Sequence, residues 1–410
     1  MHGLSSGILE LMGPLSGIRV VEVGVWHAGP GAGAILGDMG ADVIKVETFE
    51  GDPERHFGAF GPMASTSEAH IENWSGVYEF SNRNKRSVCL DLTNPEGREA
   101  FERLIATADV FLTNLRGPTV TKLGLDPATI SAINPRLIHH AVSGFGSTGP
   151  MADQGGFDSM GQGVAGLMYL GSDDPVVLQM LVLDQLTAIT AAFAIITSLF
   201  VRERDGQGPA SHTSLYAAGT WLAARNLQAT ALAGRDISTA WDRRAQSPLR
   251  TTFECKGGAI MGTNHPEHKF WPSLCEALGR ADLVSDARFA STQDRLTNSH
   301  ALYAELDPIF AIKSRSDWLE ILSAHGLLFA PVNRPSDVLT DPQALANNYV
   351  TDFDHEDLGR LRLPGFPVQF EGFSAGPQTR APRLGEHTVE VLQELGLNPD
   401  ALQAAGAIPR

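Results

Sequence analysis

The amino-acid sequence predicts an α/β fold, with a Rossmann-like, doubly wound large domain and a smaller α+β domain. Three observations support this prediction. Short apolar runs rich in Val and Ile alternate with helical stretches, a Gly-rich turn follows the first run, and the pattern changes to a hairpin and helices in the middle of the chain. We expect the large domain at 1–215, the small domain with its connecting helix at 216–330, and a return to the large domain at 331–410.

The large domain begins with two strands around a helix. Residues 17–24 (GIRVVEVG) form a Val-rich apolar run, which is typical of a buried strand, and residues 41–47 (ADVIKVE) form a second one. This β–turn–α–β order is the entrance of a parallel sheet. Further strands are expected at the end of 81–92 and at 109–113, 136–143 and 210–215, with helices at 31–39, 95–106, 127–133 and 185–201.

The small domain is predicted from a different pattern. Residues 251–262 (TTFECKGGAIMG) read as a hairpin with its turn at Lys256-Gly257-Gly258. Helices of this domain are expected at 270–278, 301–312 and 316–325, after a connecting helix at 217–233. Pro-dotted return segments at 333–349 and 369–382 are expected before a final helix at 388–395.

The composition is that of a soluble globular protein with material for two domains, at 410 residues, 43% hydrophobic and 19% charged. A net charge of −16 argues against nucleic acid and anionic membranes as partners. The three cysteines form no CxxC pair, and residues 1–13 lack the pattern of a secretory signal, so we expect a reduced, cytoplasmic setting. The apolar run 176–201 is a poor membrane span because Asp184 lies within it.

Asp184 is the centre of the most unusual stretch. It is the only charged residue between Asp174 and Arg202, and the apolar run 185–201 follows it. A helix that is apolar on nearly every side is expected inside a protein. Asp184 is therefore expected where that helix starts, either capping free N–H groups or reacting from a dry pocket. The residues alone favour the capping role.

A dinucleotide site and a metal site fit the sequence less well. The turn Gly29–Gly33 resembles a dinucleotide fingerprint, but its spacing is GxGxG rather than GxGxxG. Glycines that let a helix pack close to a strand explain it better, so an NAD-dependent oxidoreductase is a weak alternative. His265 and His268 form HxxH rather than HExxH, and we expect no metal site.

Basic residues gather near strands of the predicted sheet. Lys45, the segment 83–86 and Arg116 are the candidates, although a solvated surface explains any one of them alone. Open α/β sheets bind ligands at the carboxyl ends of their strands, where 25–31 and 114–116 should lie. A phosphorylated ligand with a carboxylate nucleophile is consistent with this pattern.

Eight stretches in order resemble one known family. They are LSGIRVVEVG…AGP…LGDMGADVIKVE, NRNKRSVCLDL, TNLRGPTVTKLGLD, NPRLIHHAVSGFGSTGP, GGFDSMGQGVAG, LFVRERDGQG, PVNRPSDVLTDPQ and APRLGEHTVEVLQELGL, from Leu15 to Leu397. On these stretches the chain is identified as a member of the class III CoA-transferases, which are related to formyl-CoA and carnitine CoA-transferases and to α-methylacyl-CoA racemase.

The resemblance implies an acyl-CoA:carboxylate CoA-transferase with Asp184 as the nucleophile. In that family the aspartate forms an acyl-aspartyl anhydride and then an aspartyl-CoA thioester, with CoA as substrate and no permanently bound cofactor. The resemblance also implies an interlocked homodimer. It points to CoA-binding roles for Lys45, Arg83, Arg86, Asn114 and Arg116.

The resemblance separates transfer from racemisation at one position. Racemases of the family carry a motif like G-H-D, whereas this chain has Gly156-Phe157-Asp158. Phenylalanine cannot move a proton, so racemisation is disfavoured unless His27 or His140 replaces that histidine. We expect the substrate pocket to involve Trp26, His27, Phe157 and Met180. Arg243 and Arg244 either meet a substrate carboxylate or lie on the surface, and the segment around them lacks the glycine-rich loop of the oxalate-specific members.

Overall fold

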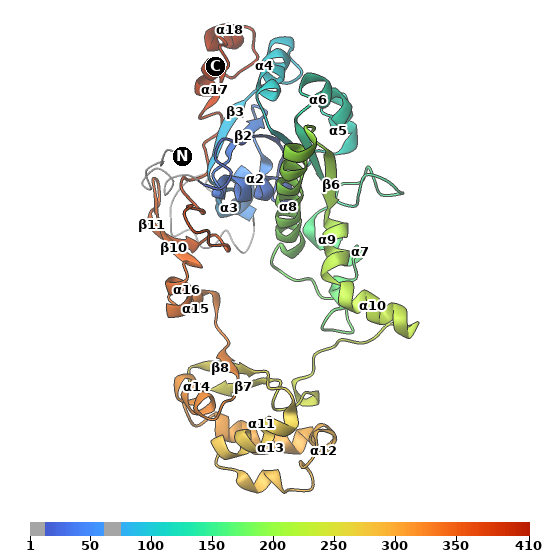
Figure 1. Cartoon of the computed structure of the whole chain (residues 1–410), viewed down its shortest axis with the longest axis vertical. Coiled ribbons are helices and arrows are strands. Elements are labelled where there is room, and N and C mark those ends of the chain that lie inside the picture. The colour runs from blue at the N-terminus through green and yellow to red at the C-terminus, as the bar shows by residue number, and fades with distance from the viewer. Residues whose placement is uncertain (1–12, 61–74) are drawn as a thin grey trace. The chain divides into compact units, whose positions relative to one another are not determined.

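The computed structural model describes residues 13–60 and 75–410, which form two compact units (Figure 1). The larger unit is built on a six-stranded sheet whose neighbouring strands pair in parallel, in the order β3-β2-β1-β4-β5-β6. The strands are β1 Arg19–Val23, β2 Asp42–Glu47, β3 Lys85–Cys89, β4 Val110–Thr113, β5 Ile138–Ser143 and β6 Ala210–Ser214. This is the order of the Rossmann fold, and the predicted α/β architecture is confirmed.

Helices cover both faces of this sheet. The larger unit contains α2 Ala28–Asp38, α3 Gly76–Asn82, α4 Pro95–Ala106, α5 Gly117–Lys122, α6 Pro127–Ile133, α7 Asp158–Val164, α8 Val182–Asp205, α9 Leu215–Leu222, α10 Ala224–Ala233, α17 Thr388–Glu394 and α18 Pro399–Ala404. It also contains the 3₁₀ turns η1 Pro53–Phe60 and η3 Leu167–Tyr169 and the two-stranded β10 Val350–His355 with β11 Gly359–Pro364. The segment 217–233, predicted as one helix, is divided between α9 and α10 at Ala223.

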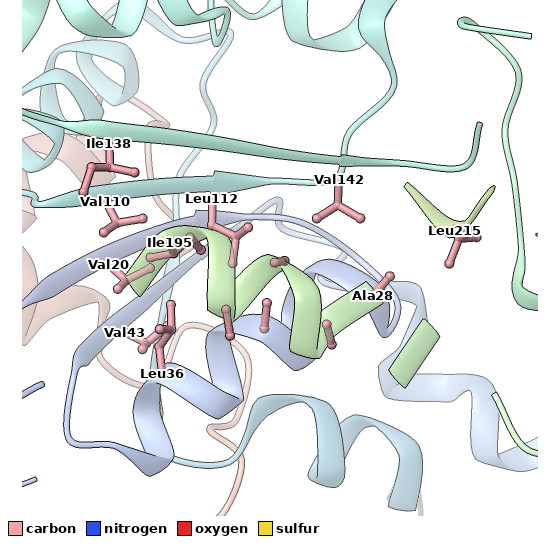
Figure 2. Packing of buried hydrophobic residues seen from close by; sticks show 14 of the residues in the cluster. Val20, Ala28, Leu36, Val43, Val110, Leu112, Ile138, Val142, Ile195 and Leu215 are labelled. Atoms are coloured by element: carbon pink, nitrogen blue, oxygen red, sulfur yellow. The ribbon is translucent and has the colours of Figure 1, made fainter. Parts of the chain in front are cut away.

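Side chains point alternately to the two faces of the sheet, and each face is covered by its own hydrophobic core. Val20 of β1 faces α2 and α8, where it joins Leu36 and Ile195 in one buried cluster (Figure 2). The next residue, Val21, points to the opposite face and packs with Phe101 of α4. Successive side chains of a strand point to opposite faces, so a parallel sheet buried on both sides needs continuous apolar runs.

The glycines after β1 serve packing. A Cβ on Gly31 would lie 3.0 Å from the Ala188 side chain, and one on Gly33 would lie 2.1 Å from the Glu22 carboxylate. These positions therefore let α2 lie close to α8 and to the sheet, as the close-packing interpretation of the turn predicts.

The smaller unit comprises 171–173 and 238–350. Its sheet, in the order β7-β8-β9, consists of β7 Thr252–Cys255, β8 Gly258–Gly262 and β9 Phe329–Pro331, paired antiparallel. Around it lie η4 Arg243–Ala245, α11 Glu267–Ala277, η5 Ala281–Val284, α12 Thr292–Thr297, α13 Ser299–Phe310, α14 Arg315–Ala324, α15 Pro335–Val338 and α16 Pro342–Ala346. The return segment expected at 333–349 thus contains two short helices.

The compact units have other boundaries than those expected from the sequence. Residues 216–237 group with the larger unit because α9 continues directly from β6 and packs against α7 and α8. Residues 331–350 group with the smaller unit, where β9 pairs with β8.

The helix α8 is not buried on all sides within this chain, contrary to the sequence-based expectation. Ala188, Ala191 and Ile195 lie in the core beside the sheet. A second face of α8 is exposed along its length, at Ile189, Phe193, Ile196 and Phe200. By length and composition α8 passes the test for a membrane span, with a mean hydropathy of 1.6, but so does the core helix of a soluble protein.

Candidate active site

Asp184 lies in the first turn of α8, but it does not cap that helix. The carboxylate of Asp158, at the start of α7, accepts hydrogen bonds from the backbone N–H groups of Leu183 at 2.7 Å and Asp184 at 3.0 Å. Leu181, immediately before the helix, has a left-handed backbone with φ of 31°. The capping role that the residues alone favour for Asp184 therefore belongs to Asp158, and the Asp184 side chain is left available.

The surroundings of Asp184 bring the pKa of its carboxyl group close to neutral pH. Burial, together with the smaller effect of the negative charge of Asp158, raises the pKa of Asp184 to about 7. Among the residues that the structure describes, none is recorded as a hydrogen-bond or ion-pair partner of the Asp184 carboxylate. An unpaired, partly desolvated carboxylate that ionises near neutral pH is a suitable nucleophile.

Aromatic side chains gather beside Asp158. Trp26, which has a positive φ of 62°, packs edge-on against Phe57 at 5.4 Å and against Phe157 at 5.6 Å between ring centroids. Phe157 directly precedes Asp158 and is 55% exposed. Positive φ at a bulky residue is typical of functional sites. Two of the expected pocket residues are thus brought together, and Phe57 joins them although no sequence pattern singled it out.

His27 is tied to the residue that follows Asp184. Its Nε2 lies 2.7 Å from Oε1 of Gln185, its Nδ1 lies 2.8 Å from Oγ of Ser81, and its ring stacks on Phe80. Burial lowers the pKa of His27, so the ring is neutral at pH 7. Met180 is the fourth expected pocket residue; it lies in the loop before α8 and is 67% exposed.

Lys45 and Asn114 have structural partners. The Lys45 ammonium is fully buried, 3.0 Å from the Glu22 carboxylate and 2.9 Å from that of Asp52. Asn114 bonds both the N–H and the C=O of Val25, at 2.9 and 2.6 Å. The prediction that Lys45 binds a phosphate of CoA does not fit a side chain sealed beneath the surface with two carboxylates.

The remaining cations divide between the two edges of the sheet. Arg83 pairs with Asp38 at the end of α2, and Arg86 pairs with Asp42 at 2.7 Å. Asp42 and Arg86 stand at the amino ends of β2 and β3, opposite to the edge where ligands of such sheets bind. Arg116 follows β4 at the carboxyl edge, is exposed, and has no ion pair among the described residues. Of the five expected CoA ligands, Arg116 is the one whose charge is accessible at that edge.

Arg243, one of the two arginines considered for a substrate carboxylate, is held inside the smaller unit. Its guanidinium forms an ion pair with Asp307 and stacks over the rings of Phe253 and Tyr303, 5.1 and 4.5 Å from their centroids. These contacts give Arg243 a structural role in that unit.

A cavity of about 360 Å³ opens at the carboxyl edge of the sheet. Its floor is the ends of β1 and β2, and the loops after β3 and β4 form its walls. The lining combines apolar side chains with hydroxyl groups and acidic residues. The apolar ones are Val23, Val46, Leu90, Leu92, Leu115 and Leu123, the hydroxyl groups are those of Thr48, Thr93 and Thr119, and the acidic residues are Glu47, Glu50, Asp52 and Asp91. The rule for the carboxyl ends of strands predicts this position, but the particular lining residues had no sequence signal.

Together, the parallel sheet and the cavity at its carboxyl edge have the layout of an α/β enzyme, and the Asp184 carboxylate at the start of α8 is the candidate reactive group. The sequence model of CoA-transferase family III matches residues 15–388, and the chain belongs to this family. It is an acyl-CoA:carboxylate CoA-transferase.

Relatives and solved structures are similar to this chain over nearly its whole length. The chain is 33% identical to succinate–glutarate CoA-transferase of Agrobacterium fabrum, over 93% of this chain and 96% of the relative. It is 32% identical to an acyl-CoA transferase of Fusarium pseudograminearum, over 95% of this chain and 86% of the relative. The crystal structure of a CAIB/BAIF family protein from Brucella suis is similar with a TM-score of 0.82 and 31% identity, covering 94% of this chain and all of that one.

Proposed function

We propose that this enzyme moves CoA from an acyl-CoA to a carboxylic acid through covalent intermediates on Asp184. The Asp184 carboxylate attacks the thioester carbonyl, giving an acyl-aspartyl anhydride and CoA thiolate. The thiolate then attacks the aspartyl carbonyl, which forms aspartyl-CoA thioester and releases the donor acid as its carboxylate. The acceptor carboxylate attacks this thioester to give a new anhydride, and the thiolate attacks the acyl carbonyl, which releases the new acyl-CoA and restores Asp184.

One observation carries this proposal: the Asp184 carboxylate is partly desolvated, has no hydrogen-bond or ion-pair partner among the described residues, and has a pKa of about 7. Desolvation makes a carboxylate more nucleophilic and keeps water from an anhydride. The names of relatives, such as succinyl-CoA:glutarate CoA-transferase and succinyl-CoA:mesaconate CoA-transferase, support exchange of CoA between carboxylic acids.

Racemisation is the second candidate, and the surroundings of Asp184 disfavour it. Phe157 replaces the histidine of the racemase motif, and a two-base reaction needs a second proton carrier. His27 has both ring nitrogens engaged. His140 is buried, with its pKa lowered to about 4 by burial and the neighbouring histidines, and its Nδ1 contacts Ser211. Neither histidine is placed to take over that role.

We propose that the CoA nucleotide binds at the carboxyl edge of the sheet, with its phosphates at Arg116, the exposed cation next to Leu115 of the cavity lining. Replacing Arg116 by Ala should raise KM for acyl-CoA about 10-fold while kcat stays unchanged, because a phosphate loses a charged hydrogen bond that is equally present in ground and transition states. Arg103→Ala, which removes an exposed charge on α4, is the matched control. An unchanged KM in Arg116→Ala would place the phosphates elsewhere.

The exposed stripe on α8 supports the expected homodimer. Ile189, Phe193, Ile196 and Phe200 recur at helical spacing, and exposed apolar patches of this kind mark interfaces. We expect Phe193→Asp combined with Phe200→Asp to shift the native dimer to monomer in sedimentation velocity, since two charges would be buried without partners. A native protein that sediments as a monomer contradicts the dimer.

We also propose a cytoplasmic location, because the three cysteines are dispersed and unpaired.

Covalent trapping tests the reaction directly. Native enzyme is incubated with acetyl-, succinyl-, butyryl- and an aryl-acyl-CoA and quenched with hydroxylamine, and its peptides are weighed. We expect a hydroxamate on the peptide that contains Asp184, dependent on acyl-CoA. Transfer activity without such an adduct at Asp184 would contradict the proposed intermediates, and exchange of an α-proton in its place would indicate racemisation.

A further inference from the structure

A buried amide–carboxylate pair on α7 holds the turn that carries Asp184. Gln162 is fully buried, and its Oε1 accepts the N–H of Leu178 at 2.9 Å while its Nε2 donates to the C=O of Leu178 at 3.0 Å. The same Nε2 donates to Oδ1 of Asp158. The other oxygen of Asp158 takes the N–H groups of Leu183 and Asp184. One connected set of hydrogen bonds therefore links the loop before α8 with the first turn of α8.

The pair also places a second negative charge beside the nucleophile. Asp158 is 6% exposed and has backbone and amide donors but no ion-pair partner among the described residues. Because Asp158 is buried and Asp184 is partly buried, solvent reduces the repulsion between the two carboxylates less than it would at the surface. Acylation of Asp184 removes its charge, so this repulsion is present before the attack and relieved once the anhydride has formed.

We propose that Asp158, held by Gln162, is a positioning residue that fixes the backbone of the nucleophile turn and destabilises the free Asp184 carboxylate relative to the acylated form. This inference rests on the proposed role of Asp184 as nucleophile. It assigns Asp158 and Gln162 separate tasks: Asp158 supplies the charge and the cap, and Gln162 supplies the support that orients Asp158.

Other groups around α8 do not account for the same effect. The elements packed on α8 carry further titratable side chains. They are His27 before α2, Asp38 at the end of α2, where it pairs with Arg83, His139 and His140 in β5, His212 in β6 and Tyr216 in α9. The raised pKa of Asp184 has burial and the charge of Asp158 as its two causes. His27 is neutral and bonded to Gln185, one residue away.

The variant Asp158→Asn removes the charge and keeps the cap, because an Asn carbonyl oxygen still accepts the two N–H groups of α8. Its NH2 group then faces Nε2 of Gln162, so this variant also loses the hydrogen bond from Gln162. We expect the acid limb of kcat/KM to move to lower pH by about one unit, since the repelling charge is gone. We expect kcat on the plateau to fall about 10-fold with KM for acyl-CoA unchanged, since less repulsion is relieved on acylation. Asp126→Asn, which alters the equivalent cap of α6 far along the chain, is the matched control.

Two further variants address Gln162. The double variant Asp158→Asn with Gln162→Glu exchanges the carboxylate and the amide of the pair. The negative charge then lies one hydrogen bond further from Asp184, and the amide introduced at position 158 can donate to the new carboxylate at position 162. We therefore expect the acid limb of kcat/KM to return toward its native pH. Gln162→Met keeps the Asp158 charge but removes its support. This variant should lower kcat about 100-fold through misplacement of the turn while the acid limb stays in place.

Carbodiimide labelling of Asp184 distinguishes failure of this inference from failure of the proposed reaction. The labelling follows the protonated carboxyl group and needs no acyl donor, so its pH midpoint, read by peptide mass, reports Asp184 even in an inactive enzyme. A midpoint that falls in Asp158→Asn and not in Asp126→Asn supports the inference. Midpoints that coincide in native enzyme and Asp158→Asn, both folded by thermal melting, overturn it, as does an equal shift in Asp126→Asn.

Discussion

Replacing Asp184 by Asn is expected to abolish CoA transfer, with kcat reduced about 10⁴-fold or more, because an amide cannot form the anhydride. The fold should survive, since the N–H of residue 184 still bonds the Asp158 carboxylate. The measurement is transfer between two acids, followed by separation of the acyl-CoA products, together with hydroxylamine trapping. Asp205→Asn, at the other end of α8, is the control because that carboxylate is exposed and pairs with Arg204. A variant at 184 that keeps native kcat would remove Asp184 from the reaction.

The same substitution should raise thermal stability in alkaline solution. The pKa of Asp184 is about 7 in the folded protein, against an ordinary value of 3.8, so the folded state holds the proton more tightly than the unfolded chain. Stability from this group is therefore lost as pH rises from about 4 to about 7 and stays lost above that range. Asn carries no such cost. Tm of Asp184→Asn should exceed that of the native enzyme at pH 8, and the difference should shrink toward pH 4.

The sequence predicted those features that follow from a local pattern of residue types along the chain. Val-rich runs such as 17–24, alternating with helical stretches, are typical of strands buried on both faces of a parallel sheet, so they predicted the α/β fold and its strands. Asp184 was visible because a single charge in a long apolar stretch is conspicuous. The GxGxG spacing of the turn after β1 favoured a packing role for its glycines, and the close contacts at Gly31 and Gly33 agree with that interpretation.

Roles that depend on side-chain partners were not visible. Lys45 and Arg86 look alike in a sequence, yet one is sealed between Glu22 and Asp52 and the other pairs at the amino edge of the sheet. Asp158 lies 26 residues before Asp184, and only the meeting of α7 with α8 makes it the cap. The exposed face of α8 was missed because hydrophobicity predicts burial without saying whether the same chain provides the cover.

Lys45→Met should strongly destabilise the larger unit. Although burial disfavours a charged ammonium, Asp52 and Glu22 outweigh that effect and raise the pKa of Lys45 well above its usual value. Removal of the cation leaves Asp52 buried without its counterion, while Glu22 retains Lys85 at 2.8 Å. Breaking a buried pair in this way costs about 3–5 kcal/mol, which urea denaturation and a lower Tm should show.

A second substitution separates this structural role from binding of CoA. Asp52→Asn keeps an oxygen for the backbone N–H groups of Trp26 and Glu54, which Oδ1 of Asp52 accepts at 3.1 and 2.9 Å, but removes the stranded charge. Lys45→Met with Asp52→Asn should therefore regain much of the lost stability, and its KM for acyl-CoA should match the native value. If Lys45 binds a CoA phosphate, the opposite pattern holds: Lys45→Met raises KM without lowering Tm, and the second substitution restores nothing. Since the ammonium has no exposed surface and two carboxylates already surround it, we expect the loss of stability and its rescue.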